Sequence, residues 1–171
     1  KDNLVSVSIS MTTLDKSLAR VMEPRASAPH KRLAAIEALS KAGIKTLVQA
    51  SPMIPGLNDH ELERILVECR GKGAESAIYL LLRLPMDVAG LFENWLWENF
   101  PDRAARVMKL VRSTRGGKNY DAEFGKRMVG TGPYAALINK RFRLACQQLG
   151  FEASKYNLAT DPFLNPGRDK S

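Results

Sequence analysis

Hydroxyl side chains recur at every second position near the start of the chain. Apolar residues in the run 4–12 alternate with Ser6, Ser8, Ser10 and Thr12. This alternation is typical of a β-strand, in which successive side chains project to opposite faces. Hydroxyl groups along one face of a strand could bind a polar ligand, because each can donate and accept hydrogen bonds. They could equally bond to backbone carbonyls, and the sequence leaves both interpretations open.

Further polar candidates lie where the other predicted strands end. In parallel α/β folds, ligands collect at the carboxyl ends of strands and in the loops that follow them. This rule selects Arg25 after the first strand, Gln49 in the second, and Arg83 in the third, where Tyr79 has the same parity as Arg83. An arginine there can hold a carboxylate through two parallel hydrogen bonds. The alternative for each arginine is an ion pair with an acidic neighbour.

Positive charge is concentrated in one segment of the sequence. The 171 residues include 26 Lys and Arg against 18 Asp and Glu, and residues 101–150 alone contain 11 of the basic and 3 of the acidic residues. Such a segment attracts anions, including nucleic acid backbones, although it could also be a solvated helical face. The candidate contacts for nucleic acid or another anion are Arg103, Arg106, Lys109, Arg112, Arg115, Lys118, Lys140, Arg141 and Arg143.

The cysteines and the apolar runs indicate what kinds of protein are not expected. Cys69 and Cys146 are 77 positions apart, so the sequence shows no closely spaced ligand set for zinc or an iron–sulfur cluster, and we predict no metal ligands. No apolar run approaches the roughly 20 residues of a membrane helix, and no signal-peptide pattern opens the chain. We therefore expect a cytoplasmic protein with reduced thiols and no membrane contact.

Strands and helices are predicted to alternate over the first 85 residues and to position these candidates. We expect strands at 4–12, 44–51 and 76–83, separated by helices at 14–22, 30–42 and 58–69. This order is typical of βαβ units, so the strands should be parallel and adjacent in sequence order, with helices on one side. The later part of the chain predicts helices at 88–100, 102–113 and 133–149. The fold class is therefore α/β.

Several sequence blocks, taken in order, resemble the C-terminal half of radical SAM superfamily proteins. The similarity extends from about residue 4 to residue 149 and is greatest to uncharacterised bacterial proteins related to spore photoproduct lyase. The order of the blocks is more specific than any one of them. They are Ser8–Asp15, Met22-Glu-Pro-Arg25, Ala42-Gly-Ile44, Pro52–Asp59, Leu82-Arg-Leu-Pro85 and Arg115-Gly-Gly-Lys118.

The resemblance implies a partial (β/α)6 barrel in which the three strands are the fourth, fifth and sixth. Residues 1–86 would form this part of the barrel, 87–150 a helical extension that is basic from 101, and 151–171 an extended tail. Three parallel strands make a poor complete domain, so we expect the N-terminal half-barrel of the same protein as a partner; the alternative is a compact three-stranded domain. The exposed sheet edge would otherwise favour self-association.

The resemblance also implies cofactors and a reaction. Full-length members use S-adenosylmethionine and a four-iron four-sulfur cluster to generate a 5′-deoxyadenosyl radical, which abstracts hydrogen from a substrate. The cluster motif CxxxCxxC is missing from this sequence, so this chain alone should be inactive and bind no cofactor. Ser8 and Ser10 would contact the methionine and ribose parts of S-adenosylmethionine and Arg25 its carboxylate, while the same lumen would be lined by Thr12, Gln49 and Arg83.

The substrate is not indicated by the sequence. Relatedness to a DNA lesion lyase, together with the basic segment 101–150, favours a nucleic acid. The competing hypothesis is a non-enzymatic α/β module that binds nucleic acid through its basic helices. This alternative has little motif support, since neither an RNP-like nor a helix-turn-helix pattern is present.

Overall fold

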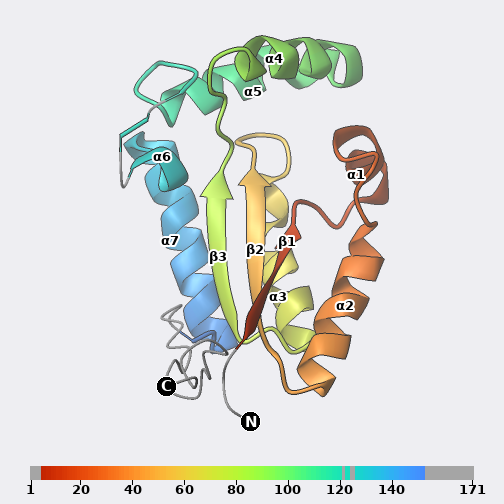
Figure 1. Ribbon diagram of the computed structural model, residues 1–171. Helices are drawn as coiled ribbons and strands as arrows, with labels where there is room; N and C mark the ends of the chain where they lie inside the picture. Colours follow the sequence, from red (N-terminus) through yellow and green to blue (C-terminus); the bar gives the residue numbers. More distant parts are fainter. Residues whose placement is uncertain (1–4, 121, 124–125, 153–171) are drawn as a thin grey trace, which may run out of the picture.

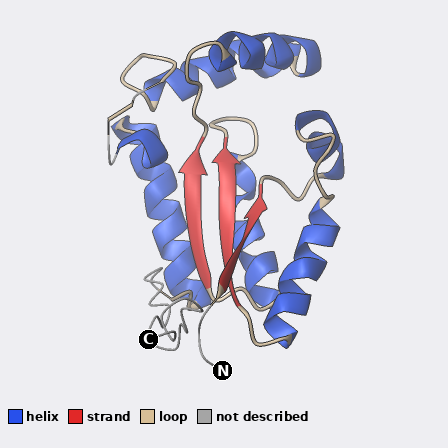
Figure 2. Ribbon diagram, in the orientation of Figure 1, coloured by secondary structure: helices blue, strands red, loops and turns tan. Residues whose placement is uncertain are grey.

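Three parallel strands form the centre of the molecule. The computed structural model describes residues 5–120, 122–123 and 126–152. Strands β1 (Ser6–Met11), β2 (Lys45–Met53) and β3 (Ser76–Leu81) lie side by side in that order (Figures 1 and 2). Both neighbouring pairs are parallel. The predicted α/β class, strand direction and strand order are confirmed, and the arrangement is compatible with part of a radical SAM barrel.

Helices connect the strands and continue after the last of them. The bounds of α2, α4, α5 and α7 agree with the predicted helices to within a few residues, whereas α6 falls in a stretch where the sequence predicted only a connection. The helical elements are α1 (Lys16–Met22), α2 (Pro29–Lys41), η1 (Asp59–Glu61), α3 (Leu62–Gly71), α4 (Val88–Asn99), α5 (Pro101–Ser113), α6 (Lys126–Val129) and α7 (Gly132–Leu149). Among the described residues, every helix is too short or too polar to cross a lipid bilayer.

The apolar face of the sheet is covered by α2, α3 and α7. The strand register pairs Met11 with Ala50 and Ala50 with Tyr79, so these side chains share one face. All three are buried in one hydrophobic core with residues of the three helices, including Ile36, Ile65 and Ile138. Burial of this face drives the packing of the helices onto the sheet. The prediction that the helices lie on one side is confirmed.

The predicted side for Tyr79 is wrong. We expected Tyr79 on the polar side with Arg83, but the register places it on the helix side, where it is 5% exposed. Its ring lies 4.8 Å from that of Phe142, centroid to centroid, and its hydroxyl accepts a hydrogen bond from Asn139 Nδ2 at 3.0 Å. The polar face of β3 carries Ile78 instead, aligned with Gln49.

Strand β2 is longer than predicted. We expected it to end at Ser51, because Pro52 has no N–H to donate to a sheet. The strand continues to Met53, with a register shift between Ala50 and Met53 that accommodates the proline. Pairing resumes past this irregularity, where the Leu82 N–H donates to the Met53 carbonyl at 2.9 Å.

A second core lies beyond the carboxyl end of the sheet. Helices α4 and α5 lie across this end, at the top of Figure 1. Leu96 of α4 and Val107 of α5 are fully buried there against Ile54, Leu57 and Leu84, which come from the loops that follow β2 and β3. The loops at the strand ends are therefore held by the helices after β3 as well as by the sheet.

Candidate functional site

A polar surface lies on the face of the sheet opposite the helices. Ser10 is aligned with Gln49, and Gln49 with Ile78, so the three side chains share this face. Ser8 precedes Ser10 on the same face, and both serines are exposed, whereas Gln49 is half-buried. None of the helices in the described part of the chain crosses this face (Figure 1). The structure thus brings three predicted site residues together on an accessible surface.

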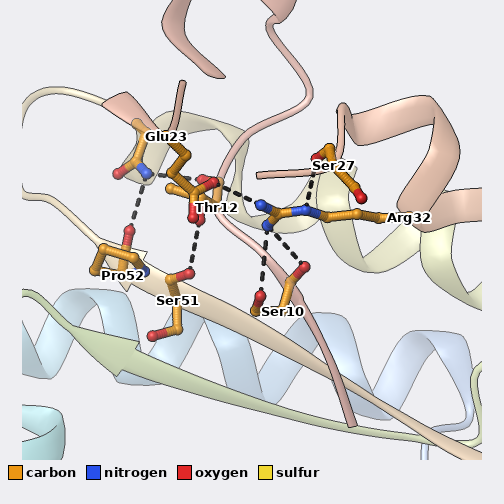
Figure 3. A network of polar contacts seen from close by, with 8 residues as sticks. Ser10, Thr12, Glu23, Ser27, Arg32, Ser51 and Pro52 are labelled. Atoms are coloured by element: carbon orange, nitrogen blue, oxygen red, sulfur yellow. Dashed lines mark hydrogen bonds and ion pairs between the residues drawn. The ribbon is translucent and has the colours of Figure 1, made fainter. Parts of the chain in front are cut away.

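Arg32 of α2 anchors the end of β1, a role that the sequence analysis missed. Its Nη1 donates to the Ser10 carbonyl at 3.1 Å and lies 3.4 Å from Ser10 Oγ (Figure 3). Its Nε donates to the Ser27 carbonyl at 2.9 Å, and its Nη2 pairs with Glu23 at 3.0 Å. The side chain is only 11% exposed. No local pattern distinguishes Arg32 from the other helical arginines, because its partners lie on separate segments.

The Thr12 side chain hydrogen-bonds to the backbone and does not contribute to the open surface. It is 1% exposed, and its Oγ1 donates to the Ser51 carbonyl at 2.9 Å (Figure 3). The fully buried Asn58 reinforces the same junction: its Nδ2 donates to the Thr12 carbonyl at 2.8 Å and to the Pro52 carbonyl at 3.0 Å. For Thr12 the structural alternative is therefore correct, since this hydroxyl fastens the end of β1 to the end of β2.

Glu61 fixes the loop that follows β1. Its carboxylate accepts hydrogen bonds from Thr13 Oγ1 at 2.5 Å and from the Leu14 N–H at 2.8 Å. Asp15 then caps α1 by accepting from the N–H and the hydroxyl of Ser17. Hydrogen bonding from Ser17 lowers the pKa of Asp15 below its ordinary value. Two carboxylates near the strand end are thus used to shape the loop.

The two arginines among the predicted cofactor-binding residues, Arg25 and Arg83, form no hydrogen bond with Ser8 or Ser10 within the described residues. Arg25 is exposed and forms no hydrogen bond or ion pair within the described residues. Arg83 is half-buried, and its Nη2 donates to the Tyr120 hydroxyl at 3.2 Å, with the guanidinium carbon 5.7 Å from the ring centroid. Its Nη1 lies 3.6 Å from Met128 Sδ. These contacts hold Arg83 next to β3, which β2 separates from β1.

Arg115 is a structural residue, and its predicted role as an anion contact is wrong. The side chain is 1% exposed. Its Nη2 donates to the carbonyls of Leu81 and Leu82 at 3.2 and 2.9 Å, and its Nη1 to those of Lys126 and Arg127 at 3.1 and 3.0 Å. The guanidinium therefore joins the end of β3 to α6 and is not accessible to an external phosphate.

Arg141 also has internal partners, although its side chain is 26% exposed, so its predicted role as an anion contact stays a prediction. Its Nε and Nη2 donate to the two carboxylate oxygens of Glu63 at 2.7 and 2.6 Å, and Nη2 donates to the Asp59 carbonyl at 2.9 Å. The hydrogen bond from Arg141 lowers the pKa of Glu63. Asp59 accepts from the Tyr134 hydroxyl at 2.8 Å, and burial is the main cause that raises the pKa of Tyr134 to about 12.

The other basic candidates of residues 101–150 differ in exposure. Arg112 is partly exposed and pairs with Glu93 at 3.2 Å while donating to Asn119 Oδ1 at 2.8 Å. Six of the predicted candidates have exposed side chains and remain candidates for contacts with an anion: Arg103, Arg106, Lys109, Lys118, Lys140 and Arg143.

The described residues do not fit an iron–sulfur cluster. No group of three or more His, Cys, Asp or Glu side chains among them is placed to hold a metal ion. Cys69 is fully buried, and burial raises the pKa of its thiol to about 12. Burial also raises the pKa of the Cys146 thiol, to about 11. Because a thiolate is the form that binds iron, neither cysteine is prepared to act as a ligand.

Comparison with known proteins relates the segment that contains β1 and β2 to one superfamily. Residues 1–69 match the radical SAM superfamily. This segment includes β1, β2 and the polar surface of Ser8, Ser10 and Gln49. No solved structure matches the chain. The part of the sequence that forms the candidate site is therefore the part that the superfamily match covers.

Relatives occur in mycobacteria. The chain is 32% identical over 110 residues to the uncharacterized protein Mb2609c of Mycobacterium bovis and, equally, to the uncharacterized protein Rv2578c of Mycobacterium tuberculosis strain H37Rv. The aligned residues make up 63% of this chain and 32% of each relative. The chain thus spans about a third of the length of the curated relatives that it matches.

Proposed function

We propose that this chain is part of a radical SAM enzyme and that the open face of β1 and β2 binds S-adenosylmethionine. The observation that carries the proposal is the coincidence of two features in one segment. Residues 1–69 match the superfamily, and the same residues supply the accessible polar surface of Ser8, Ser10 and Gln49. S-adenosylmethionine offers a carboxylate, an amino group and ribose hydroxyls, all of which hydrogen-bond to such side chains.

The contacts of Ser10 suit a ligand that accepts hydrogen bonds. Arg32 Nη1 is positioned to donate to Ser10 Oγ, which leaves the hydroxyl proton of Ser10 free for a carboxylate or ribose oxygen. Gln49 lies beside Ser10 and can both donate and accept. When bound, S-adenosylmethionine and the iron–sulfur cluster supply the chemistry that generates a 5′-deoxyadenosyl radical. The residues described here would bind and orient S-adenosylmethionine, and the cluster needs ligands from elsewhere.

The proposed architecture places β1, β2 and β3 as the fourth, fifth and sixth strands of a (β/α)6 barrel. In this proposal residues 1–86 belong to the barrel and 87–150 form a helical extension. The open polar face and the free outer edge of β1 within the described residues support an additional half-barrel as the partner. A second copy of this chain at that edge is the alternative. Kinship with spore photoproduct lyase belongs to the same proposal and rests on the sequence blocks.

The proposal is tested with the full-length protein. After anaerobic reconstitution with iron and sulfide, reduction with dithionite in the presence of S-adenosylmethionine should release 5′-deoxyadenosine, measured by chromatography. Ser10→Ala and Gln49→Ala should each weaken S-adenosylmethionine binding by about tenfold in equilibrium dialysis, as expected for loss of a hydrogen bond to a charged ligand. Ser113→Ala, an exposed serine on α5, is the matched control. Absence of 5′-deoxyadenosine, or unchanged binding by both variants, would reject the proposal.

A nucleic acid is the substrate class that the surface charge favours. The exposed cations on α5 and α7 include Arg106, Lys109, Lys140 and Arg143. Titration of labelled single- and double-stranded DNA should show binding that weakens steeply as salt rises, because neutralised phosphates release counterions. Binding at low salt by a protein that forms no 5′-deoxyadenosine would favour the non-enzymatic module. Absence of binding at low salt would remove nucleic acid as the substrate and leave the radical chemistry untouched.

A further inference from the structure

A groove separate from the open sheet face lies between three helical elements. It has a volume of about 690 Å³ and is bounded by α1, by the η1–α3 junction and by the α4–α5 junction. These three elements surround the upper right part of the molecule in Figure 1, next to the carboxyl end of the sheet. Its volume falls in the range of ligand pockets in proteins.

Three basic side chains line this groove. His60 and Arg64 come from the η1–α3 junction, and Arg103 comes from the first turn of α5. Arg64 and Arg103 are exposed, and neither forms an ion pair or a side-chain hydrogen bond within the described residues. This distinguishes them from Arg141 and Arg115, whose donors are used internally. Two arginines with free donors at one groove can bind a phosphate group through charge-assisted hydrogen bonds.

The acidic side chains in the lining already have partners. Asp15 accepts hydrogen bonds from Ser17, and Glu61 accepts from Thr13 and Leu14. Glu61 is 5% exposed, whereas Asp15 is exposed and keeps its negative charge at the groove. Neither carboxylate pairs with an arginine. Both shape the wall of the groove, and the arginine donors remain available to a ligand.

One part of the lining is apolar. Leu57 is buried, Val21 is partly exposed, and Phe100 is half-buried with its ring 5.5 Å from that of Trp95, centroid to centroid. The groove therefore combines the two free guanidinium groups with an aromatic and aliphatic part. A ligand that combines a phosphate with a flat, weakly polar ring matches both.

We propose that this groove binds a nucleotide unit, with its phosphate on Arg64 and Arg103 and its base against the apolar wall at Phe100. The site is separate from the proposed S-adenosylmethionine surface and does not depend on radical chemistry. The nucleotide unit could belong to a nucleic acid strand or to a free nucleotide, since both present the same phosphate and base. A strand would extend from the groove along the other exposed cations of α5, which begin with Arg106.

The test measures binding by the full-length protein without S-adenosylmethionine. A fluorescein-labelled single-stranded oligonucleotide is followed by anisotropy and adenosine monophosphate by calorimetry, both at low salt. Arg64→Gln and Arg103→Gln should each weaken binding of at least one probe by about tenfold, as expected for loss of a charged hydrogen bond. Arg20→Gln removes an equal charge from an exposed position on α1 outside the groove and serves as the matched control. Circular dichroism checks that each variant is folded.

The outcomes separate the groove from a diffuse surface field. Losses for Arg64→Gln and Arg103→Gln that Arg20→Gln does not share support the groove, and the probe that is affected identifies a strand or a free nucleotide as its ligand. Equal losses for Arg103→Gln, Arg106→Gln and Arg20→Gln would show that only net charge matters and would overturn the proposal. No binding of either probe would also overturn it. Formation of 5′-deoxyadenosine is measured separately, so failure here is distinguishable from failure of the proposed function.

Discussion

Arg115 and Arg103 lie in the same basic segment, yet the fold uses them in opposite ways. Arg115 is buried and donates to four backbone carbonyls that join β3 to α6. Arg103, one helix earlier, is exposed at the edge of a groove and has no ion pair among the described residues. Both count equally toward the net charge of +8. Charge counted along the sequence therefore overstates the positive surface that a partner can reach.

The comparison predicts that Arg115 contributes most to stability. Arg115→Met keeps much of the side-chain length but leaves four backbone carbonyls at the end of β3 and in α6 without this donor, so the free energy of unfolding should fall by about 4 kcal/mol. Urea denaturation followed by circular dichroism measures the change. Arg106→Met is the control at an exposed position of α5 and should change stability by less than about 0.5 kcal/mol. Similar losses in the two variants would contradict the contrast.

Arg141 should have an intermediate effect that depends on pH. Hydrogen bonding from Arg141 lowers the pKa of Glu63 from its ordinary value of 4.5, so the pair stabilises the fold above that pH. This stabilisation is lost as the pH falls through the lowered pKa and Glu63 becomes protonated. Arg141→Gln should therefore cost about 1 kcal/mol at neutral pH, because Glu63 is partly exposed, and less in acid.

Thermal unfolding of wild type and Arg141→Gln between neutral pH and pH 2 measures that dependence. The difference between the two melting temperatures should narrow as the solution becomes more acidic. Glu63→Gln should reproduce the flattened profile, and the double variant should lose little more than Arg141→Gln alone, because Glu63 pairs with Arg141. A difference that stays constant across the range would show that the charge of Glu63 does not contribute to the stabilisation by Arg141.

Arg112 should have the smallest measurable effect. Its ion pair with Glu93 joins side chains that are 40% and 36% exposed, so Arg112→Gln should reduce stability by about 0.5 kcal/mol. Salt screens exposed pairs, so the difference from wild type should shrink in 1 M sodium chloride, where the Debye length is about 3 Å, and only the share of the hydrogen bond to Asn119 should persist. Urea titrations at low and high salt measure this. A difference that is unchanged at high salt would show that the ion pair with Glu93 contributes nothing measurable.

The sheet was predictable because its signals are local. Alternation of apolar and hydroxyl residues in β1 indicated both a strand and the face that Ser8 and Ser10 occupy, and the helical spacing around Ile36 indicated α2. The odd–even position of a residue along the strand was a less reliable guide to its face in β3. Tyr79 is polar only at its hydroxyl, and the ring is buried on the helix side where Asn139 satisfies that group. A side chain with an apolar body and a polar tip suits either face, so its side depends on the partners that the fold provides.

The sequence by itself determined the α/β class, the three parallel strands and the hydroxyl face of β1. Strand and helix periodicities could be recognised because they depend only on residues a few positions apart. Only the tertiary structure decided which polar side chains remain available. Arg32 reaches Ser10 across 22 positions, Glu61 reaches Thr13 across 48, and Arg141 reaches Glu63 across 78. A charged side chain has an internal partner only if the fold brings a group of suitable chemistry to within about 3 Å of it. The spacing of residues along the sequence does not show which distant residues will come that close.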